Sequence, residues 1–452
     1  LRKPTVNSDN PTNRYYNVLN LQSFFGRANI DFANRYLFTF TIRADGSSLF
    51  TEENRWGYFP AAGFAWKIKE ESFLKEVNAL NNLKLRIGYG QTGQQDITGA
   101  VGFYPSIPLF VAGDNNSQYL PGSSLYSALP FNPNLTWEKT TTYNAGLDFD
   151  FFRNSFLSGS FDIYKRETTD LLARVPVPPG QAFSNTFIDN VGETKSEGFE
   201  LNVNLRPIQN ENFGFSVSSN LAYNRTEVTN LDDIELLSAG GTLRGTGAFL
   251  LYNAVGQEPN SAFVFKQVYD TAGNPIPNSF VDLNGDNIIN NDDRYFKQIA
   301  PNWTFGFGLN FDYKNWDLSA NFRGQLDGNV YNLNKLNYGF TESALPVNNT
   351  SISNVLNFYD GAANPVFNNV IGNIQFSDYF LEGASFLRCD NIALGHRFNN
   401  MVKNGSVRFY GAVTNPFLVT NYSGQDPENF GGIDGNFYPR PTVYTLGINF
   451  DF

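Results

Sequence analysis

The stretch Tyr36-Leu37-Phe38-Thr39-Phe40-Thr41-Ile42-Arg43 decides the fold class of this chain. Its even positions are all aromatic or apolar, whereas the odd positions from 39 onward hold Thr, Thr and Arg. Successive side chains of a strand point to opposite faces, so the stretch predicts a β-strand with one apolar and one mostly polar face.

The same alternation recurs along the whole chain. It predicts thirteen strands at 19–31, 36–44, 57–68, 83–92, 135–151, 155–167, 191–206, 213–229, 302–313, 316–326, 386–396, 406–414 and 441–452. The composition agrees, because 44 Phe and 23 Tyr favour alternating strands with aromatic girdles over a helical core rich in Leu and Ala.

Connections between these strands alternate between short and long. Short connections such as 152–154 and 314–315 contrast with long ones such as 93–134 and 230–301. Long loops of this kind are unusual in a compact soluble domain. Short periplasmic turns at one end and long extracellular loops at the other are typical of outer-membrane barrels. One periplasmic connection, 69–82, has apolar residues at helical spacing and is expected to be helix-like.

The odd number of strands bears on completeness. In a closed antiparallel barrel the first and last strands pair antiparallel, which requires an even number. We therefore expect an all-β fold in which residues 1–452 form the C-terminal part of a transmembrane antiparallel β-barrel, with an N-terminal portion missing. The alternative is a complete soluble β-sandwich or lectin. The one-sided loop lengths and the amphipathic last strand ending on Phe452 argue against it.

Charge and rare residues exclude several functions. The 32 Lys and Arg against 43 Asp and Glu give a net charge of −11, which argues against nucleic-acid binding. The single Cys389 excludes an intramolecular disulfide and a Cys-based zinc cluster. The single His396 excludes a multi-His metal site and would have to serve any Ser-His-Asp triad. We expect no enzyme activity.

Motifs spread in order along the chain carry a family resemblance. They are 43–48 (RADGSS), 56–60 (WGYFP), 89–93 (YGQTG), 135–139 (LTWEK), 282–286 (DLNGD), 385–388 (SFLR), 422–428 (YSGQDPE), 438–441 (YPRP) and 447–452 (GINFDF). Together they make the chain resemble the C-terminal part of a SusC/RagA-type TonB-dependent transporter of the Gram-negative outer membrane.

The resemblance implies an architecture, partners and a function. It implies a barrel of about 22 strands whose lumen holds an N-terminal plug, of which the plug and the first strands are absent from this sequence. It implies coupling to TonB, a SusD-like surface lipoprotein as lid, and dimers of such pairs. The expected function is active import of a bulky nutrient, either a glycan or oligosaccharide or a peptide. Inward side chains such as Thr39, Thr41 and Arg43 would contact plug or substrate. The alternative is an extracellular carbohydrate-binding β-protein without transport.

Residues 282–293 form a candidate calcium-binding loop. Oxygen ligands at loop positions 1, 3, 5, 7, 9 and 12 are the EF-hand scheme. These positions hold Asp282, Asn284, Asp286, Ile288 (through its carbonyl), Asn290 and Asp293. Position 6 is Asn287, which tolerates the left-handed conformation, and position 12 is Asp in place of the usual Glu. The alternative is a solvated Asx-rich turn in an extracellular loop.

Aromatic and amide or acidic residues in the long loops are the candidates for substrate contact, since aromatic rings stack on apolar sugar faces and Asn or Asp bind hydroxyls. The candidates are Tyr104, Asn115, Tyr119, Tyr126, Tyr338, Tyr359, Tyr422 and Asp426. The alternative for each is packing within the loops or against plug or lid.

Two further expectations concern the membrane and assembly. Trp137, Trp303 and Trp316 near strand ends are expected in the interfacial aromatic girdle. The alternating apolar residues that end on a terminal Phe resemble the signal read by the outer-membrane assembly machinery. That signal would comprise Tyr444, Leu446, Ile448, Phe450 and Phe452.

Overall fold

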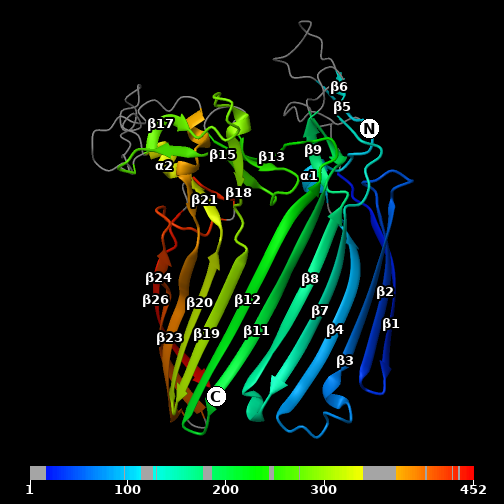
Figure 1. The fold of residues 1–452 in the computed structure, drawn as a ribbon. Coiled ribbons are helices and arrows are strands. Elements are labelled where there is room, and N and C mark those ends of the chain that lie inside the picture. The colour runs from blue at the N-terminus through cyan, green and yellow to red at the C-terminus, as the bar shows by residue number, and fades with distance from the viewer. Residues whose placement is uncertain are drawn as a thin grey trace, which may run out of the picture.

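The computed structural model describes residues 17–95, 97–112, 126–128, 130–176, 186–243, 249–273, 275–338, 373–402, 405–429, 431–435 and 438–451. Its main element is one curved sheet of thirteen antiparallel strands (Figure 1). In sheet order these are β1 (Leu21–Phe32), β2 (Tyr36–Ser47), β3 (Trp56–Lys67), β4 (Leu80–Gly93), β7 (Lys139–Phe151), β8 (Leu157–Thr169), β11 (Glu193–Gln209), β12 (Phe213–Asn230), β19 (Trp303–Tyr313), β20 (Trp316–Leu326), β23 (Phe386–Val402), β24 (Gly405–Thr420) and β26 (Val443–Asp451). The predicted all-β fold and strand count are confirmed, and β1 and β26 form the two edges of the sheet.

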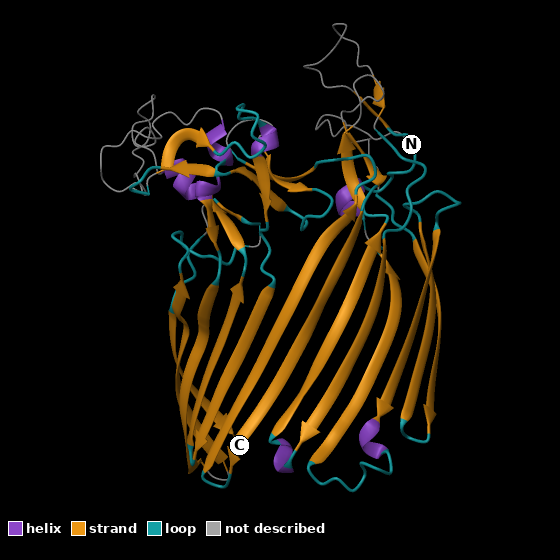
Figure 2. Cartoon of the chain, in the orientation of Figure 1, coloured by secondary structure: helices purple, strands orange, loops and turns teal. Residues whose placement is uncertain are grey.

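The remaining elements gather at the two ends of this wall (Figure 2). At the end with short turns lie η1 (Ile68–Glu70) and η3 (Arg153–Ser155). At the other end lie α1 (Thr98–Val101), β5 (Phe110–Ala112), β6 (Tyr126–Ala128), β9 (Leu172–Pro176), β10 (Thr186–Asn190), β13 (Leu237–Thr242), β14 (Phe249–Asn253), β15 (Ser261–Phe265), β16 (Gln267–Tyr269), β17 (Pro275–Phe280), η4 (Asn291–Asp293), β18 (Arg294–Lys297), β21 (Asn329–Asn332), α2 (Leu333–Tyr338), η6 (Asn373–Phe376), η7 (Asp378–Phe380), β22 (Leu381–Gly383) and β25 (Ile433–Asp434). The predicted one-sided distribution of loops is therefore present.

The two faces of the wall differ in chemistry, as the alternation predicted. Residues opposite each other on paired antiparallel strands share a face. One such row crosses the wall through Phe64, Ile87, Ile163, Phe199 and Trp303. The opposite face carries most of the polar side chains of these strands. Exposed apolar side chains on the first face mark it as the outward, lipid-side surface.

The long loops fold into compact bodies that the strand pattern did not predict. The larger one, here called the loop body, joins the sheet β13-β14-β15-β18 to β21, α2, η6 and η7. Fully buried side chains form its core, among them Leu250, Tyr331, Leu336, Ile374 and Phe380. Burying each such side chain is worth roughly 1.5–3 kcal/mol, so segments distant in sequence are held as one unit.

Two sequence expectations are wrong in detail. Segment 69–82 forms only the single 3-10 turn η1 followed by turns, because Glu71 accepts hydrogen bonds from Arg35 (2.8 Å), Tyr36 (2.6 Å) and Trp66 (3.0 Å) and ties the chain to the wall. Trp137 is 1% exposed and packs against Phe50 and Phe59, so it belongs to a second loop core and not to the lipid-side girdle.

Candidate functional site

A cavity of about 740 Å³ lies where the loop body meets the extracellular end of the wall. Thr304, Arg323 and Gln325 line it from β19 and β20, on the polar inward face. Leu251 of the loop body and Glu428 of the segment before β26 close it from the other sides. The lining combines apolar side chains with a few polar ones, which is the usual character of a ligand site.

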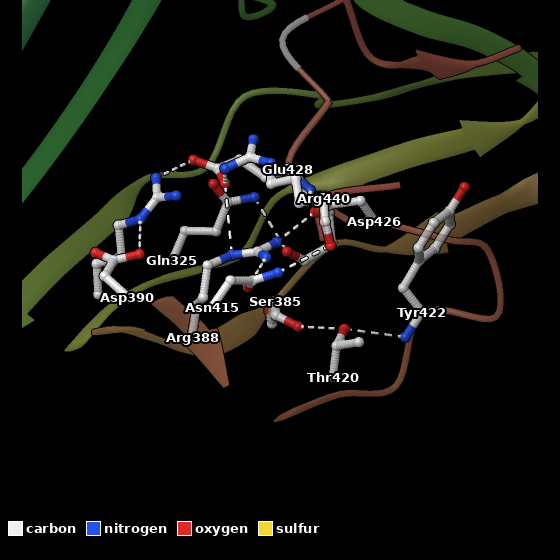
Figure 3. Close-up of polar contacts among 12 residues, drawn as sticks. Gln325, Ser385, Arg388, Asp390, Asn415, Thr420, Tyr422, Asp426, Glu428 and Arg440 are labelled. Carbon is white, nitrogen blue, oxygen red and sulfur yellow. Dashed lines mark hydrogen bonds and ion pairs between the residues drawn. The ribbon is translucent and has the colours of Figure 1, made fainter. Parts of the chain in front are cut away.

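A cluster of charged side chains, buried at its centre, supports this cavity (Figure 3). At its centre is Arg388 of β23, which is 3% exposed. Its Nη2 donates to Oδ1 of Asp426 at 2.6 Å and its Nη1 donates to Oδ1 of Asn415 at 2.8 Å. Its Nε lies 3.7 Å from Oε2 of Glu428. One arginine of the wall therefore holds the segment that carries Asp426 and Glu428.

Two further arginines complete the cluster. Arg440 places Nε 3.2 Å from Oδ2 of Asp426 and Nη1 2.7 Å from Oε2 of Glu428. Arg323 of β20 pairs with Glu428 and, at 2.8 Å, with Asp390. Buried charges are tolerated only when they are paired. Three arginines against three carboxylates meet this condition, and we refer to these six residues as the charge cluster.

The charge cluster unites motifs that are far apart in sequence. Arg388 ends the stretch SFLR, Asp426 and Glu428 end YSGQDPE, and Arg440 lies in YPRP. Sequence reasoning singled out Asp426 as a ligand contact but missed the arginines. The signal was present in these motifs, although nothing local in them shows that they meet in space.

Two predicted contact residues are buried in the connection between β24 and β26. Asp426 is 4% exposed and both of its carboxylate oxygens are bound by arginines. Tyr422 is buried, and its hydroxyl donates to Oδ2 of Asp434 at 2.7 Å. Burial, reinforced by that carboxylate, raises the pKa of Tyr422, so the phenol stays protonated. We propose a supporting role for both residues beneath the cavity.

Within the described residues, the other predicted contact residues do not line the cavity. Tyr104 lies in the loop after α1, where its hydroxyl accepts a hydrogen bond from the backbone N–H of Val18 at 3.3 Å. Tyr126 opens β6 and Tyr338 ends α2, with side chains outside the described part. Asn115, Tyr119 and Tyr359 lie outside the described residues. Substrate contact by these residues stays a prediction.

The loop 282–293 is closed by its own polar side chains. Asp282 accepts from the backbone N–H groups of Gly285 (2.6 Å) and Asn287 (2.8 Å), and Asn287 adopts the expected left-handed conformation, with φ of 65°. Asp293 accepts from Asn290 (2.9 Å) and Leu283 (2.8 Å), and these backbone hydrogen bonds lower its pKa.

The central polar side chains of this loop also accept hydrogen bonds from the loop backbone. Asn284 and Asp286 take part in the same kind of turn, each accepting from a backbone N–H two residues ahead. Within the described part of the chain, no three His, Cys, Asp or Glu side chains converge closely enough to hold a metal ion. Calcium binding through Asp282, Asn284, Asp286, Ile288, Asn290 and Asp293 therefore stays a prediction.

The last strand presents the expected alternation at the edge of the sheet. Tyr444, Leu446, Ile448 and Phe450 pair with outward residues of β24, and Leu446 is 91% exposed. Phe452 lies outside the described residues. Their role as an assembly signal is a prediction that the geometry does not test.

These features define a class of protein before any comparison. A tilted antiparallel wall with an apolar outward face, a polar inward face and folded loops at one end is the wall of an outer-membrane β-barrel. Among the described residues, no helix is long and apolar enough to cross a membrane.

Comparison with known proteins defines the family. Residues 2–247 match the family model described as TonB dependent receptor-like, beta-barrel. The TonB-dependent receptor SusC of Bacteroides thetaiotaomicron is 41% identical over 447 residues, which cover 96% of this chain and 44% of that protein. The TonB-dependent receptor P3 of Formosa agariphila is 30% identical, covering 97% of this chain and 46% of that protein. The chain therefore belongs to the TonB-dependent receptor β-barrel family of the outer membrane, and to its SusC/RagA type.

A solved structure agrees with this assignment. The RagAB peptide transporter superposes with a TM-score of 0.76 at 26% identity, over 96% of this chain and 48% of that one. The chain spans less than half the length of the curated relatives that it matches. The relatives are named as receptors and transporters, not as enzymes.

Proposed function

We propose that this chain forms part of the barrel of an importer that takes up a bulky nutrient, a glycan or oligosaccharide or a peptide, with energy delivered through TonB. The observation that carries the proposal is the 41% identity to the TonB-dependent receptor SusC along 96% of the chain. The peptide transporter RagAB, similar in fold and sequence, supports the peptide alternative.

The wall supports a further part of the proposal. In lipid, the unpaired backbone groups of an edge strand must find partners. We infer that the free edges of β1 and β26 pair with strands of the remainder of a larger barrel. The polar inward face, which includes Thr39, Thr41 and Arg43, would then contact a plug or the substrate.

The cavity provides the substrate end of this mechanism. It lies between the loop body and the inward face of β19 and β20. This is the end of the wall that carries the long loops (Figure 1). A SusD-like lipoprotein placed over the loops would close it, and dimers of such pairs are part of the same proposal. The residues do no covalent chemistry here: they bind and orient the substrate until the path through the lumen opens. The outward apolar rows argue against a soluble carbohydrate-binding protein.

Purification from outer membranes tests the partner and the substrate class. The full-length protein carrying this chain is expected to co-purify with a lipoprotein in equal amount, together with a glycan or a peptide identified by mass spectrometry. A preparation that is water-soluble and lacks a lipoprotein would contradict the proposal.

Uptake by a cavity variant tests the site. Thr304 is exposed on the inward face of β19 and lines the cavity, so Thr304→Trp fills space that the substrate needs. Growth on the transported nutrient should fall for Thr304→Trp and stay normal for the matched control Thr304→Ser. Equal growth of the two variants would exclude this cavity from the transport path.

Calcium binding by the 282–293 loop is a separate, structural proposal. If the cation holds this loop, calcium should protect it from proteolysis in the full-length protein, and Asp286→Ala should abolish that protection. Equal cleavage with calcium and with EDTA would leave the Asx-rich turn as the whole explanation.

A further inference from the structure

An ordered patch of charged side chains lies on the outward face of the wall near its extracellular end. Three neighbouring strands each carry a basic and an acidic residue two positions apart, so the two side chains share a face. This is the outward face, because they lie an even number of positions along their strands from the apolar row described above. The pairs are Lys165 with Glu167 on β8 (2.5 Å), Lys195 with Glu197 on β11 (2.5 Å) and Arg225 with Glu227 on β12 (3.8 Å). We call these six residues the outer charge patch.

Strand register turns these pairs into two alternating rows. Lys165 lies opposite Glu197, which lies opposite Arg225. In the next row toward the extracellular end, Glu167 lies opposite Lys195, and Lys195 lies opposite Glu227. Each basic group therefore has acidic neighbours on its own strand and across the ladder. These contacts place alternating basic and acidic side chains side by side on the outward face.

An apolar groove of about 800 Å³ leads up to this patch. Its walls are Phe40, Ile87, Tyr143 and Ile163, and the small side chains of Ala62 and Ala145 leave its floor low. The groove ends at Lys165 and Glu197. All of the wall and floor side chains belong to outward rows of β2, β3, β4, β7 and β8.

The level of the patch matches the boundary between hydrocarbon and headgroups. Two residues before Arg225 on β12, the outward row contains Tyr223 paired with Trp303, aromatic residues of the kind found at membrane interfaces. Two residues of strand correspond to roughly 6–7 Å. The strands lean, so a row of paired residues also climbs from β2 toward β12 (Figure 1). The groove therefore lies at acyl-chain depth and the patch at headgroup depth.

We propose that the groove and the outer charge patch bind a phosphorylated acyl lipid of the outer leaflet. An acyl chain occupies the groove between Phe40 and Ile163. The phosphate lies against Lys165 and its basic neighbours Lys195 and Arg225. The three glutamates orient these cations and bind the divalent cations that accompany a phosphate-rich lipid layer. An apolar groove that ends in alternating basic and acidic groups matches an amphiphile whose anionic head carries divalent counterions, which commits the site to a lipid.

Bound lipid in the purified full-length protein tests this proposal. The protein is extracted from outer membranes in mild detergent, and phosphate and fatty acids per protein are quantified by mass spectrometry of an organic extract. The double variant Lys165→Glu with Arg225→Glu should retain about twenty-five-fold less lipid, since each of the two basic groups near an anionic surface contributes about a factor of five. Ala145→Phe, which fills the groove from the lipid side, should also reduce retention.

The control is Arg166→Glu, which makes one such charge reversal one residue along β8 from Lys165, on the opposite face. It should retain lipid like the unaltered protein. Resistance to dodecyl sulfate without heating verifies that each variant is folded. Equal lipid retention by the Lys165/Arg225 variant and the Arg166 control would overturn the proposal. So would cross-linking that places a second polypeptide over Tyr143 and Lys165.

Discussion

Removing the central arginine of the charge cluster should release the extracellular segment that precedes β26. Arg388→Met keeps an unbranched side chain of similar length but leaves Asp426 and Glu428 without their most buried partner. Breaking a buried pair in this way costs about 3–5 kcal/mol. Arg440 still lies 3.2 Å from Asp426 and 2.7 Å from Glu428, and Arg323 still contacts Glu428. The lower end, about 3 kcal/mol, is therefore expected.

This loss should be local. A free energy of about 3 kcal/mol corresponds to roughly two orders of magnitude in the opening equilibrium of the segment. The wall strands keep their ladder hydrogen bonds, because these are formed by backbone groups that Arg388→Met leaves unchanged. Hydrogen exchange of the full-length protein, followed by mass spectrometry, should show peptides covering 421–429 exchanging about a hundredfold faster, while peptides of β19 and β20 stay protected.

The control uses the same substitution on the same strand. Arg397 lies further along β23 with half of its side chain exposed and pairs with Asp451 at 3.0 Å. Exposed pairs contribute about 0–1 kcal/mol, so Arg397→Met should leave exchange in 421–429 unchanged. If Arg388→Met and Arg397→Met exchange this segment at the same rate, the charge cluster does not hold it and the reasoning is refuted.

Three smaller perturbations test other contacts. Glu71→Gln should loosen the periplasmic turn after β3, because the neutral amide accepts the three side-chain hydrogen bonds less strongly; trypsin cleavage there should increase, and unchanged cleavage would contradict this. Tyr422→Phe should destabilise the loop around the buried Asp434 by about 1–3 kcal/mol, measured as faster exchange in peptides around 434. The pKa of Asp293 is lowered by folding, so its stabilising effect is present above its ordinary pKa of 3.8 and is lost as pH falls through the folded value. Cleavage of 282–293 by pepsin, measured relative to its cleavage in Asp293→Asn at the same pH, should therefore rise as pH falls below 3.8, and a constant ratio would contradict this.

The wall was predictable because its information is local. A period of two residues places Phe38, Phe40 and Ile42 on one face whatever the neighbouring strands do, and short turns join the strands at one end of the wall. The helix-like spacing in 69–82 failed because hydrogen bonds to Glu71 from side chains of β2 and β3 outweigh a short amphipathic pattern. The prediction that Trp137 lies in the interfacial girdle was wrong for a related reason. Proximity to a strand end does not show whether a loop folds over the side chain.

The candidate site was much less predictable, since it is assembled from distant segments. Arg388 and Asp426 are separated by 38 residues, and Arg323 and Glu428 by 105. Each residue alone resembles an ordinary surface charge, and their mutual burial appears only when β20, β23 and the last loop meet. The sequence predicted substrate contact for Asp426 and Tyr422, but it could not show that their polar atoms are occupied by protein partners.

The two parts of the molecule are stabilised by different interactions, and this difference determines where movement can occur. The wall strands share continuous backbone ladders, and lipid offers no replacement for a broken ladder bond. Paired charges around Arg388 help to hold the last extracellular segment to that wall, at a level where water can solvate them if they separate. Opening there costs a few kcal/mol, within reach of ligand binding, whereas opening the wall costs far more. A ligand that enters the cavity beside Glu428 therefore acts on the part of the molecule whose movement requires the least free energy.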